Sequence, residues 1–348
     1  MEWRRGQTIG RGSSATVSIA ACCSSGEIFA VKSAELSCSE LLQREEKFLC
    51  SLSSPHIVSY KGCDITSENH KFMYNLKMEY VAAGTLIDVI RKKGGGLDEA
   101  MIKCYTQQIL QGLEYLHSSG VAHCDIKATN ILVGDTGAKI ADLGCAKWVD
   151  SDSDLTETMG GTPMFMAPEV ARGEEQSFAA DIWSLGCTII EMASGGSPWP
   201  NISDPMSVLY QIAYSGRTPD VPEYLSHQAK DFVGKCLQRD PKERWTVRQL
   251  LKHPFLEEFR YVKNQNFLDN NSPTSILDQG VWNSIEEVSE TSNDVFGLQT
   301  KYSSSCPDQR ITRFLSNSRV PNWTCEETWI TIRDIVTMKR NTIELANQ

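Results

Sequence analysis

Hydrophobic periodicity changes character near residue 95 of this 348-residue chain, and few folds accommodate such a change. Before that point β-type runs dominate, for example at residues 15–20 and 28–32, and one segment at 40–52 has helical spacing. After it, apolar residues recur at helical spacing, first over residues 97–120. The sequence therefore predicts an α+β protein in which a small β-rich lobe precedes a larger helical lobe.

Shorter patterns refine this picture. Strands are expected at 57–60 and 72–81, a hairpin turn at 134–137, and helices at 180–194, 203–215 and 226–237. From about residue 260 the chain becomes rich in Ser, Asn and Asp, which is typical of a largely disordered segment. Within it, residues 323–345 carry apolar residues at roughly helical spacing, so a short amphipathic helix is expected there.

Charge and cysteine content limit the partners. Asp and Glu outnumber Lys and Arg by 44 to 34, a formal net charge of −10, which opposes general attraction to nucleic acid or anionic lipid. No run approaches the ~18 apolar residues of a membrane span. The 12 cysteines form no Cys-x-x-Cys pair and no zinc-like spacing. We expect reduced thiols and a cytoplasmic or also nuclear location, without nucleic-acid or membrane partners.

Two early features suggest phosphate binding, but each is weak alone. Gly10 and Gly12 lie between two β-type runs, where glycine lets backbone N–H groups approach phosphate oxygens, although such glycines more often mark a turn. Lys32 ends an apolar run, and burying it would be costly without a paired anion. Most lysines in strands simply face solvent.

Two later motifs make the interpretation specific. Residues 123–130 read His-Cys-Asp-Ile-Lys-Ala-Thr-Asn, and residues 142–144 read Asp-Leu-Gly. In this order and spacing they resemble the signatures of protein kinases. The elements at 166–169, 181–186, Arg244 and 253–255 extend the resemblance, which covers residues 3 to about 256.

The resemblance implies a bilobal kinase domain at residues 3–259, with an N-lobe over about 3–81 and a C-lobe over about 82–259. Residues 260–348 then form an acidic tail, with regulators of the kinase as expected partners. Ser272 before a proline resembles a site for a proline-directed kinase, although such pairs are common by chance.

Residues 3–10, 142–148 and 161–169 narrow the resemblance to the MEKK-like group of plant mitogen-activated protein (MAP) kinase kinase kinases. This implies a serine/threonine kinase that uses ATP and Mg²⁺ to phosphorylate the activation loop of a MAP kinase kinase in a stress or hormone cascade. Two alternatives remain: a pseudokinase-like scaffold, and a receptor-like cytoplasmic kinase. Pseudokinases usually lack at least one of four residues, and all four are present here: Lys32, Asp125, Asn130 and Asp142.

Roles follow by the same resemblance and by the needs of an anionic transition state. Lys32 is expected to hold the α- and β-phosphates, oriented by Glu45, with Glu46 as the fallback. Asp125 is expected to accept the proton of the substrate hydroxyl, and Lys127 to neutralise the transferring phosphate. The expected Mg²⁺ ligands are Asn130 and Asp142.

The adenine is expected between two apolar layers. Above it lie Ile9, Val17 and Ala30, below it Leu132, with Met78 as the gatekeeper and the backbone of Glu79 and Val81 at the adenine edge. Each apolar residue taken alone is as well explained by plain core packing. Arg244 is expected to form a buried structural pair with Glu169.

Cys124 departs from the family pattern, which has arginine there to meet a phosphate on the activation loop. Cysteine offers neither charge nor two donors, so activity is expected to depend less on loop phosphorylation. Cys124 and Cys145 are expected to be small buried thiols rather than redox sensors. Thr162 is expected to be structural, whereas the loop hydroxyls open to phosphorylation are Ser151, Ser153, Thr156 and Thr158.

Overall fold

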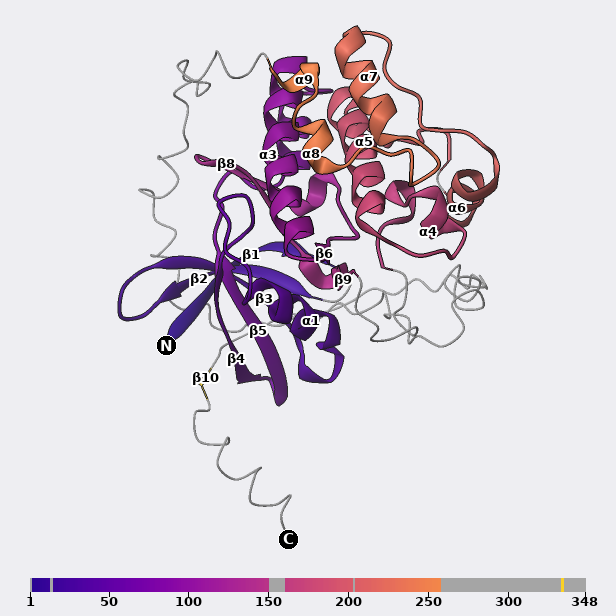
Figure 1. Ribbon diagram of the computed structural model, residues 1–348. Helices are drawn as coiled ribbons and strands as arrows, with labels where there is room; N and C mark the ends of the chain where they lie inside the picture. Colours follow the sequence, from indigo (N-terminus) through magenta and orange to yellow (C-terminus); the bar gives the residue numbers. More distant parts are fainter. Residues whose placement is uncertain (1, 13–14, 150–159, 203, 258–332, 335–348) are drawn as a thin grey trace, which may run out of the picture. The chain divides into compact units, whose positions relative to one another are not determined.

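A curved antiparallel sheet forms the N-terminal part of the computed structural model, which describes residues 2–12, 15–149, 160–202, 204–257 and 333–334. The strand order is β1-β2-β3-β5-β4-β10. The strands are β1 (Trp3–Arg11), β2 (Thr16–Cys22), β3 (Ile28–Glu35), β4 (Tyr60–Glu68), β5 (Lys71–Glu79) and β10 (Arg333–Asp334). All described residues belong to one compact unit (Figure 1).

Both faces of this sheet are covered. On one face, α1 (Glu40–Leu49) follows the short turn η1 (Leu36–Cys38) and buries Leu42, Phe48 and Leu49 against the core. On the other face, a second cluster packs together, made of Trp3, Ala20, Cys22, Phe29 and Val31. Side chains alternate between the two faces along each strand, so Lys32 on β3 points to the face opposite that of Val31.

The rest of the described chain is mainly helical. The helices are α2 (Leu86–Lys92), α3 (Glu99–Ser118), α4 (Pro168–Ala171), α5 (Phe178–Ser194), α6 (Pro205–Tyr214), α7 (His227–Cys236), α8 (Val247–Leu250) and α9 (Pro254–Glu257). Two small antiparallel sheets pair β6 (Val121–Ala122) with β9 (Lys147–Trp148), and β7 (Ile131–Gly134) with β8 (Gly137–Ile140). Three short 3₁₀ turns complete it: η2 (Ala128–Asn130), η3 (Leu143–Cys145) and η4 (Pro163–Phe165).

Two long helices form the frame on which the loops rest. Asp98 precedes helix α3, and its side chain accepts a hydrogen bond from the Met101 backbone N–H and so caps the helix. Helix α5 is buried on nearly all sides, and its Trp183 is among the largest fully buried side chains. It ends at Gly195, which has a φ of +74° and so adopts a left-handed cap that favours glycine.

The predicted α+β organisation, a β-rich N-terminal region followed by a helical one, is confirmed. The hairpin turn at 134–137 and the helices near 180–194, 203–215 and 226–237 are also present. The strand expected at 57–60 was wrong, because β4 begins only at Tyr60. Ile57 instead forms an isolated bridge to Ile140, which ties the segment after α1 to the helical region.

The helix expected within 323–345 was wrong at the two residues there that the structure describes. Arg333 and Asp334 form β10, antiparallel to Ser67 and Thr66 of β4. The other residues expected to form the helix, and the remainder of the tail with Ser272, lie outside the described residues. Among the residues described, no helix is long and apolar enough to cross a membrane.

Candidate active site

Lys32 forms the centre of one charged cluster. Its ammonium donates to Glu45 Oε2 at 2.7 Å and to Asp142 Oδ1 at 2.9 Å. Glu45 comes from α1 and is 1% exposed, whereas Asp142 follows β8 with a left-handed φ of +65°. Three segments far apart in the sequence therefore meet at one ammonium group.

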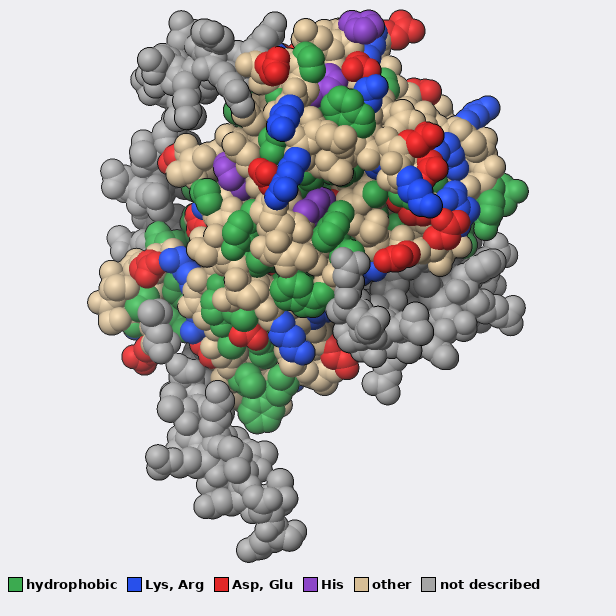
Figure 2. Space-filling view, viewed as in Figure 1, with side chains coloured by type: hydrophobic (Ala, Val, Ile, Leu, Met, Phe, Trp, Pro, Cys, Tyr) green, Lys and Arg blue, Asp and Glu red, His purple; other side chains and the backbone are tan. Residues whose placement is uncertain are grey.

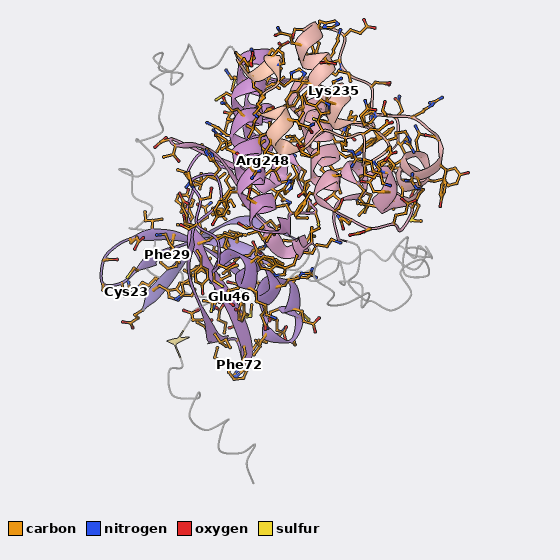
Figure 3. The ribbon with its side chains drawn as sticks, in the orientation of Figure 1. Cys23, Phe29, Glu46, Phe72, Lys235 and Arg248 are labelled. Atoms are coloured by element: carbon orange, nitrogen blue, oxygen red, sulfur yellow. The ribbon has the colours of Figure 1, made fainter. Side chains whose placement is uncertain are left out.

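Glu46 points away from Lys32. Its carboxylate accepts hydrogen bonds from the hydroxyls of Tyr60 and Tyr74, each at 2.9 Å, and from Cys63 Sγ at 3.3 Å. One residue along a helix rotates the side chain by about 100°, so only one of the two glutamates can face Lys32. Figure 3 labels Glu46 in the β-rich part of the molecule. Of the two candidates, Glu45 makes the contact.

Electrostatics keep this cluster charged. Burial disfavours the ammonium of Lys32, but Glu45 and Asp142 outweigh it and raise its pKa above the usual range. Burial likewise opposes the charge of Asp142, yet Lys32 holds the pKa of that carboxyl below its usual range. Burial raises the pKa of Glu45, so this carboxylate depends on Lys32 to remain ionised. The charged ammonium of Lys32 therefore lies beside the carboxylate of Asp142, whose pKa is low.

Asp125 forms the centre of a second cluster. Asn130 Nδ2 donates to its backbone oxygen and to Oδ2, both at 2.9 Å, and Lys127 Nζ donates to Oδ2 at 2.8 Å. The Thr162 hydroxyl donates to Oδ1 at 2.7 Å and accepts from Lys127 Nζ at 2.5 Å. Sequence reasoning expected only a structural role for Thr162 and missed its contact with Asp125.

Asp181, at the start of α5, anchors the loop that carries Asp125. Its carboxylate accepts from the backbone N–H groups of His123 at 2.9 Å and Cys124 at 2.8 Å, and contacts His117 Nε2 at 2.9 Å. Burial works against its charge, but the bonds from His117 and His123 lower the pKa of Asp181. The sequence predicted no role for Asp181; its position in the kinase-like element at 181–186 was the available signal.

Asn130 and Asp142 are joined by the backbone, since the Ala141 N–H donates to the carbonyl of Asn130 at 2.9 Å. Because the amide nitrogen of Asn130 donates to Asp125, its side-chain oxygen remains the atom suited to a cation. One carboxylate and one amide oxygen fit a hard divalent ion that keeps water or phosphate as its other ligands. Among the described residues, no group of three His, Cys, Asp or Glu side chains has metal-binding geometry.

The apolar residues expected around adenine come from both regions. Val17 is paired with Lys32 across β2 and β3, and Ala30 with Met78 across β3 and β5. Leu132 on β7 is partly buried and packs against the main core. Ile9 on β1 is 48% exposed. The other four residues therefore lie on the sheet that carries Lys32, whereas Leu132 comes from the helical region.

The glycine segment and the end of β5 complete the expected nucleotide residues. Gly10 pairs with Val17, and the Gly12 N–H donates to the carbonyl of Ala15 at 2.8 Å. Glu79 was expected to contribute backbone atoms only. Its carboxylate also binds Lys139 Nζ, at 2.7 and 2.8 Å, which sequence reasoning missed. Val81 lies close to Gly134, where an added Cβ would come within 2.9 Å of Val81 Cγ1.

Comparison with known proteins decides the family. Residues 3–256 match the family model described as protein kinase domain. Mitogen-activated protein kinase kinase kinase 18 of Arabidopsis thaliana is 50% identical over 98% of this chain and 100% of its own length. Number 17 of the same series is 47% identical over 96% of this chain and 93% of its own, and number 20 is 37% identical over 96% and 100%. The chain belongs to the protein kinases.

The resemblance to plant MEKK-like MAP kinase kinase kinases is thereby confirmed, and the protein is a serine/threonine kinase. Kinases of this family use ATP and a divalent metal ion. Lys32, Asp125, Asn130 and Asp142 all lie within the range that the family model matches. The two clusters around Lys32 and Asp125 are therefore the candidate active site of this kinase.

Several other expectations of the kinase fold can be checked. Arg244 forms the predicted buried pair with Glu169, at 2.7 and 3.0 Å, and also donates to the Ala179 carbonyl. Cys124 is buried, and burial raises the pKa of its thiol well above the usual range. Burial likewise raises the pKa of Cys145 to about 11. Cys124 is therefore buried as expected, whereas Cys145 is only partly buried. The loop hydroxyls at 151, 153, 156 and 158 lie outside the described residues.

Proposed function

We propose that this kinase transfers phosphate from ATP, with Mg²⁺, to activation-loop Ser or Thr residues of a MAP kinase kinase in a plant stress or hormone cascade. The observation that carries the proposal is the pairing of two intact clusters, around Lys32 and around Asp125. The relatives support the place in the cascade, because their names describe MAP kinase kinase kinases and their similarity extends over nearly the whole chain.

Lys32 would hold the α- and β-phosphates. Its ammonium is fixed by Glu45 and Asp142, so it loses little conformational freedom when it meets the nucleotide. Asp142 and Asn130 would hold Mg²⁺, which neutralises charge on the phosphate oxygens. This preorganised positive charge is the main stabilisation that phosphoryl transfer requires.

Asp125 would accept the proton of the substrate hydroxyl. Each of its oxygens already accepts hydrogen bonds, from Thr162, Lys127 and Asn130, which hold the carboxylate in one orientation. Lys127 lies between Asp125 and Thr162, where its positive charge can meet the transferring phosphate. The apolar residues from Ile9 to Leu132 would enclose the adenine, with Met78 at the back and the Glu79 and Val81 backbone at its edge.

The remaining proposals concern the setting. We place the kinase in the cytoplasm, with the nucleus as a second location, and we propose that regulators bind the tail at 260–348. We propose no nucleic-acid or membrane partner. The scaffold alternative is disfavoured by the intact clusters, and the receptor-like alternative by the relatives named above.

The decisive assay measures phosphate transfer from ATP and Mg²⁺ by the full-length protein to a panel of inactive plant MAP kinase kinases. Lys32→Met and Asp125→Asn proteins are the controls. We expect transfer to loop Ser or Thr of one or two members, lost in both controls. ATP binding without transfer to any member, or to a generic acceptor, would favour the scaffold alternative. Transfer to the generic acceptor alone would support kinase activity but contradict the proposed substrate class.

A further inference from the structure

Gln176 joins two segments of the active site through a single amide group. It lies between α4 and α5 and is only 6% exposed. Its Nε2 donates to the carbonyl of Gly160 at 3.2 Å and to the carbonyl of Cys124 at 3.4 Å. One carbonyl belongs to the loop that carries Asp125, and the other to the segment that carries Thr162. Both are backbone acceptors close to the phosphate-transfer centre.

The two segments touch at this point. Gly161 has a φ of +125°, and a Cβ added there would lie 2.6 Å from the Cys124 carbonyl oxygen. Cys124 itself has a left-handed φ of +67°. Such backbone strain persists only where surrounding contacts hold it. On one side, Asp181 binds the Cys124 N–H, and on the other, Gln176 binds its carbonyl.

The Gln176 amide binds the backbone at a position where this chain departs from the family pattern. Cys124 stands where the family pattern has an arginine that meets a loop phosphate. A thiol cannot form that ion pair. The amide of Gln176 needs no phosphate and reaches both segments with its two N–H groups.

We infer that Gln176 is a positioning residue. It ties residues 160–162 to the catalytic loop, so that the Thr162 hydroxyl stays on Asp125 without a phosphorylated activation loop. Gln176 touches neither substrate nor nucleotide; it acts through the backbone of Cys124 and Gly160. In this kinase a neutral pair of hydrogen bonds replaces an arginine–phosphate contact.

In the competing explanation, a phosphate on the activation loop pairs with cations other than the missing arginine. Lys147 and Arg44 both act electrostatically on Cys124, so they are the candidate cations for such a phosphate. If they performed the linking, removal of the loop hydroxyls would abolish activity, and Gln176 would matter little. The experiment therefore includes both changes.

The test uses full-length protein and a generic phosphoacceptor protein, so that it does not depend on the proposed MAP kinase kinase substrate. Gln176→Leu removes both donors at nearly constant size, and Gln176→Asn keeps the amide but shortens its reach. Gln238→Leu is the matched control, because Gln238 also donates to a backbone carbonyl, that of Gly234 on α7. The loop variant replaces Ser151, Ser153, Thr156 and Thr158 with Ala.

We expect Gln176→Leu to lower kcat about tenfold and Gln176→Asn to lower it less, with the KM for ATP unchanged, because two hydrogen bonds that order the segment are lost. Amide exchange over residues 160–166 should quicken in step. Gln238→Leu and the loop variant should keep kcat within about threefold of the parent.

Two results would overturn the inference. The first is a Gln176→Leu protein with parental kcat and parental exchange over 160–166, even if its melting temperature falls, because that marks a merely structural glutamine. The second is near-complete loss of activity in the loop variant, which assigns the linking to phosphate. If Gln176→Leu does not fold, Gln176→Asn gives the same readouts.

Discussion

At the scale of single residues, the site depends on hydroxyl and carboxylate groups that each serve several partners. The Thr162 hydroxyl donates to Asp125 and accepts from Lys127. Asp181 serves three donors at once from a fully buried position. Hydrogen bonds to charged groups are stronger than neutral ones, and an unmatched buried partner is costly. Substitutions here should therefore have effects out of proportion to their size.

Thr162→Val should lower kcat by about tenfold or more, because a charge-assisted hydrogen bond to Asp125 is worth about 1.5–3 kcal/mol. Thr162→Ser keeps the hydroxyl and should retain most activity. The KM for ATP should stay constant in both, since the Lys32 cluster is untouched. Steady-state kinetics of the three proteins check this, and equal kcat for the Val and Ser variants would contradict it.

Asp181→Asn should destabilise the protein by about 3 kcal/mol at neutral pH, since it removes a charged acceptor from buried donors. The pKa of Asp181 is depressed in the folded state, so its stabilisation is present above the unfolded pKa of about 3.9 and is lost as pH falls through the folded pKa.

Urea unfolding of both proteins across this pH range checks the sign. The gap in free energy of unfolding should be largest near neutral pH and should shrink below about pH 4. A gap that stays constant with pH would show that Asp181 contributes no linked proton.

At the scale of elements, helices that bury a clear stripe were predictable, and contacts between distant segments were not. Helix α5 was predictable from its long apolar run. The pairing of Lys32 with Glu45 followed from a family motif, and helical rotation explains why Glu46 faces elsewhere. Gln176 gave no signal, because its meaning depends on two carbonyls 16 and 52 residues away. Strand β10 depends likewise on a partner edge far along the chain.

The Arg244–Glu169 pair connects α4 to the segment before α8. Both side chains are almost fully buried, and Arg244 also holds the Ala179 and Gln238 carbonyls. Glu169→Ala should cost about 3–5 kcal/mol, because it leaves a buried guanidinium without its anion. The double variant Glu169→Ala with Arg244→Met should be less destabilised than the single one. Thermal unfolding of both decides it; equal losses would mean that Arg244 carries no charge penalty.

At the scale of the whole molecule, the sheet has one edge that receives a strand from the C-terminal region. Two of the relatives named above match over 98% and 96% of this chain, so their similarity is not confined to the kinase domain. The visible surface carries acidic and basic side chains interspersed (Figure 2). The edge of β4 pairs with Arg333 and Asp334.

Removing residues 318–348 should quicken amide exchange at Thr66 and Ser67, because their antiparallel partners Asp334 and Arg333 are lost. Exchange in α3 should be unchanged and serves as the internal control. Hydrogen-exchange mass spectrometry of the full and shortened proteins makes the comparison. Identical exchange across β4 in the two proteins would show that β10 adds nothing to the sheet in solution.

Glu79 and Lys139 join the end of β5 to β8 by a partly exposed ion pair. Opening motions between regions commonly precede product release in enzymes, and a motion that separated β5 from β8 would stretch this pair. A close, partly buried ion pair is screened little by dissolved ions, so the stiffness of the joint depends little on the surrounding medium. We expect ADP release to change little with ionic strength and to accelerate in a Lys139→Ala protein. The rate at which this joint opens would then be set by the fold itself rather than by the salt content of its surroundings.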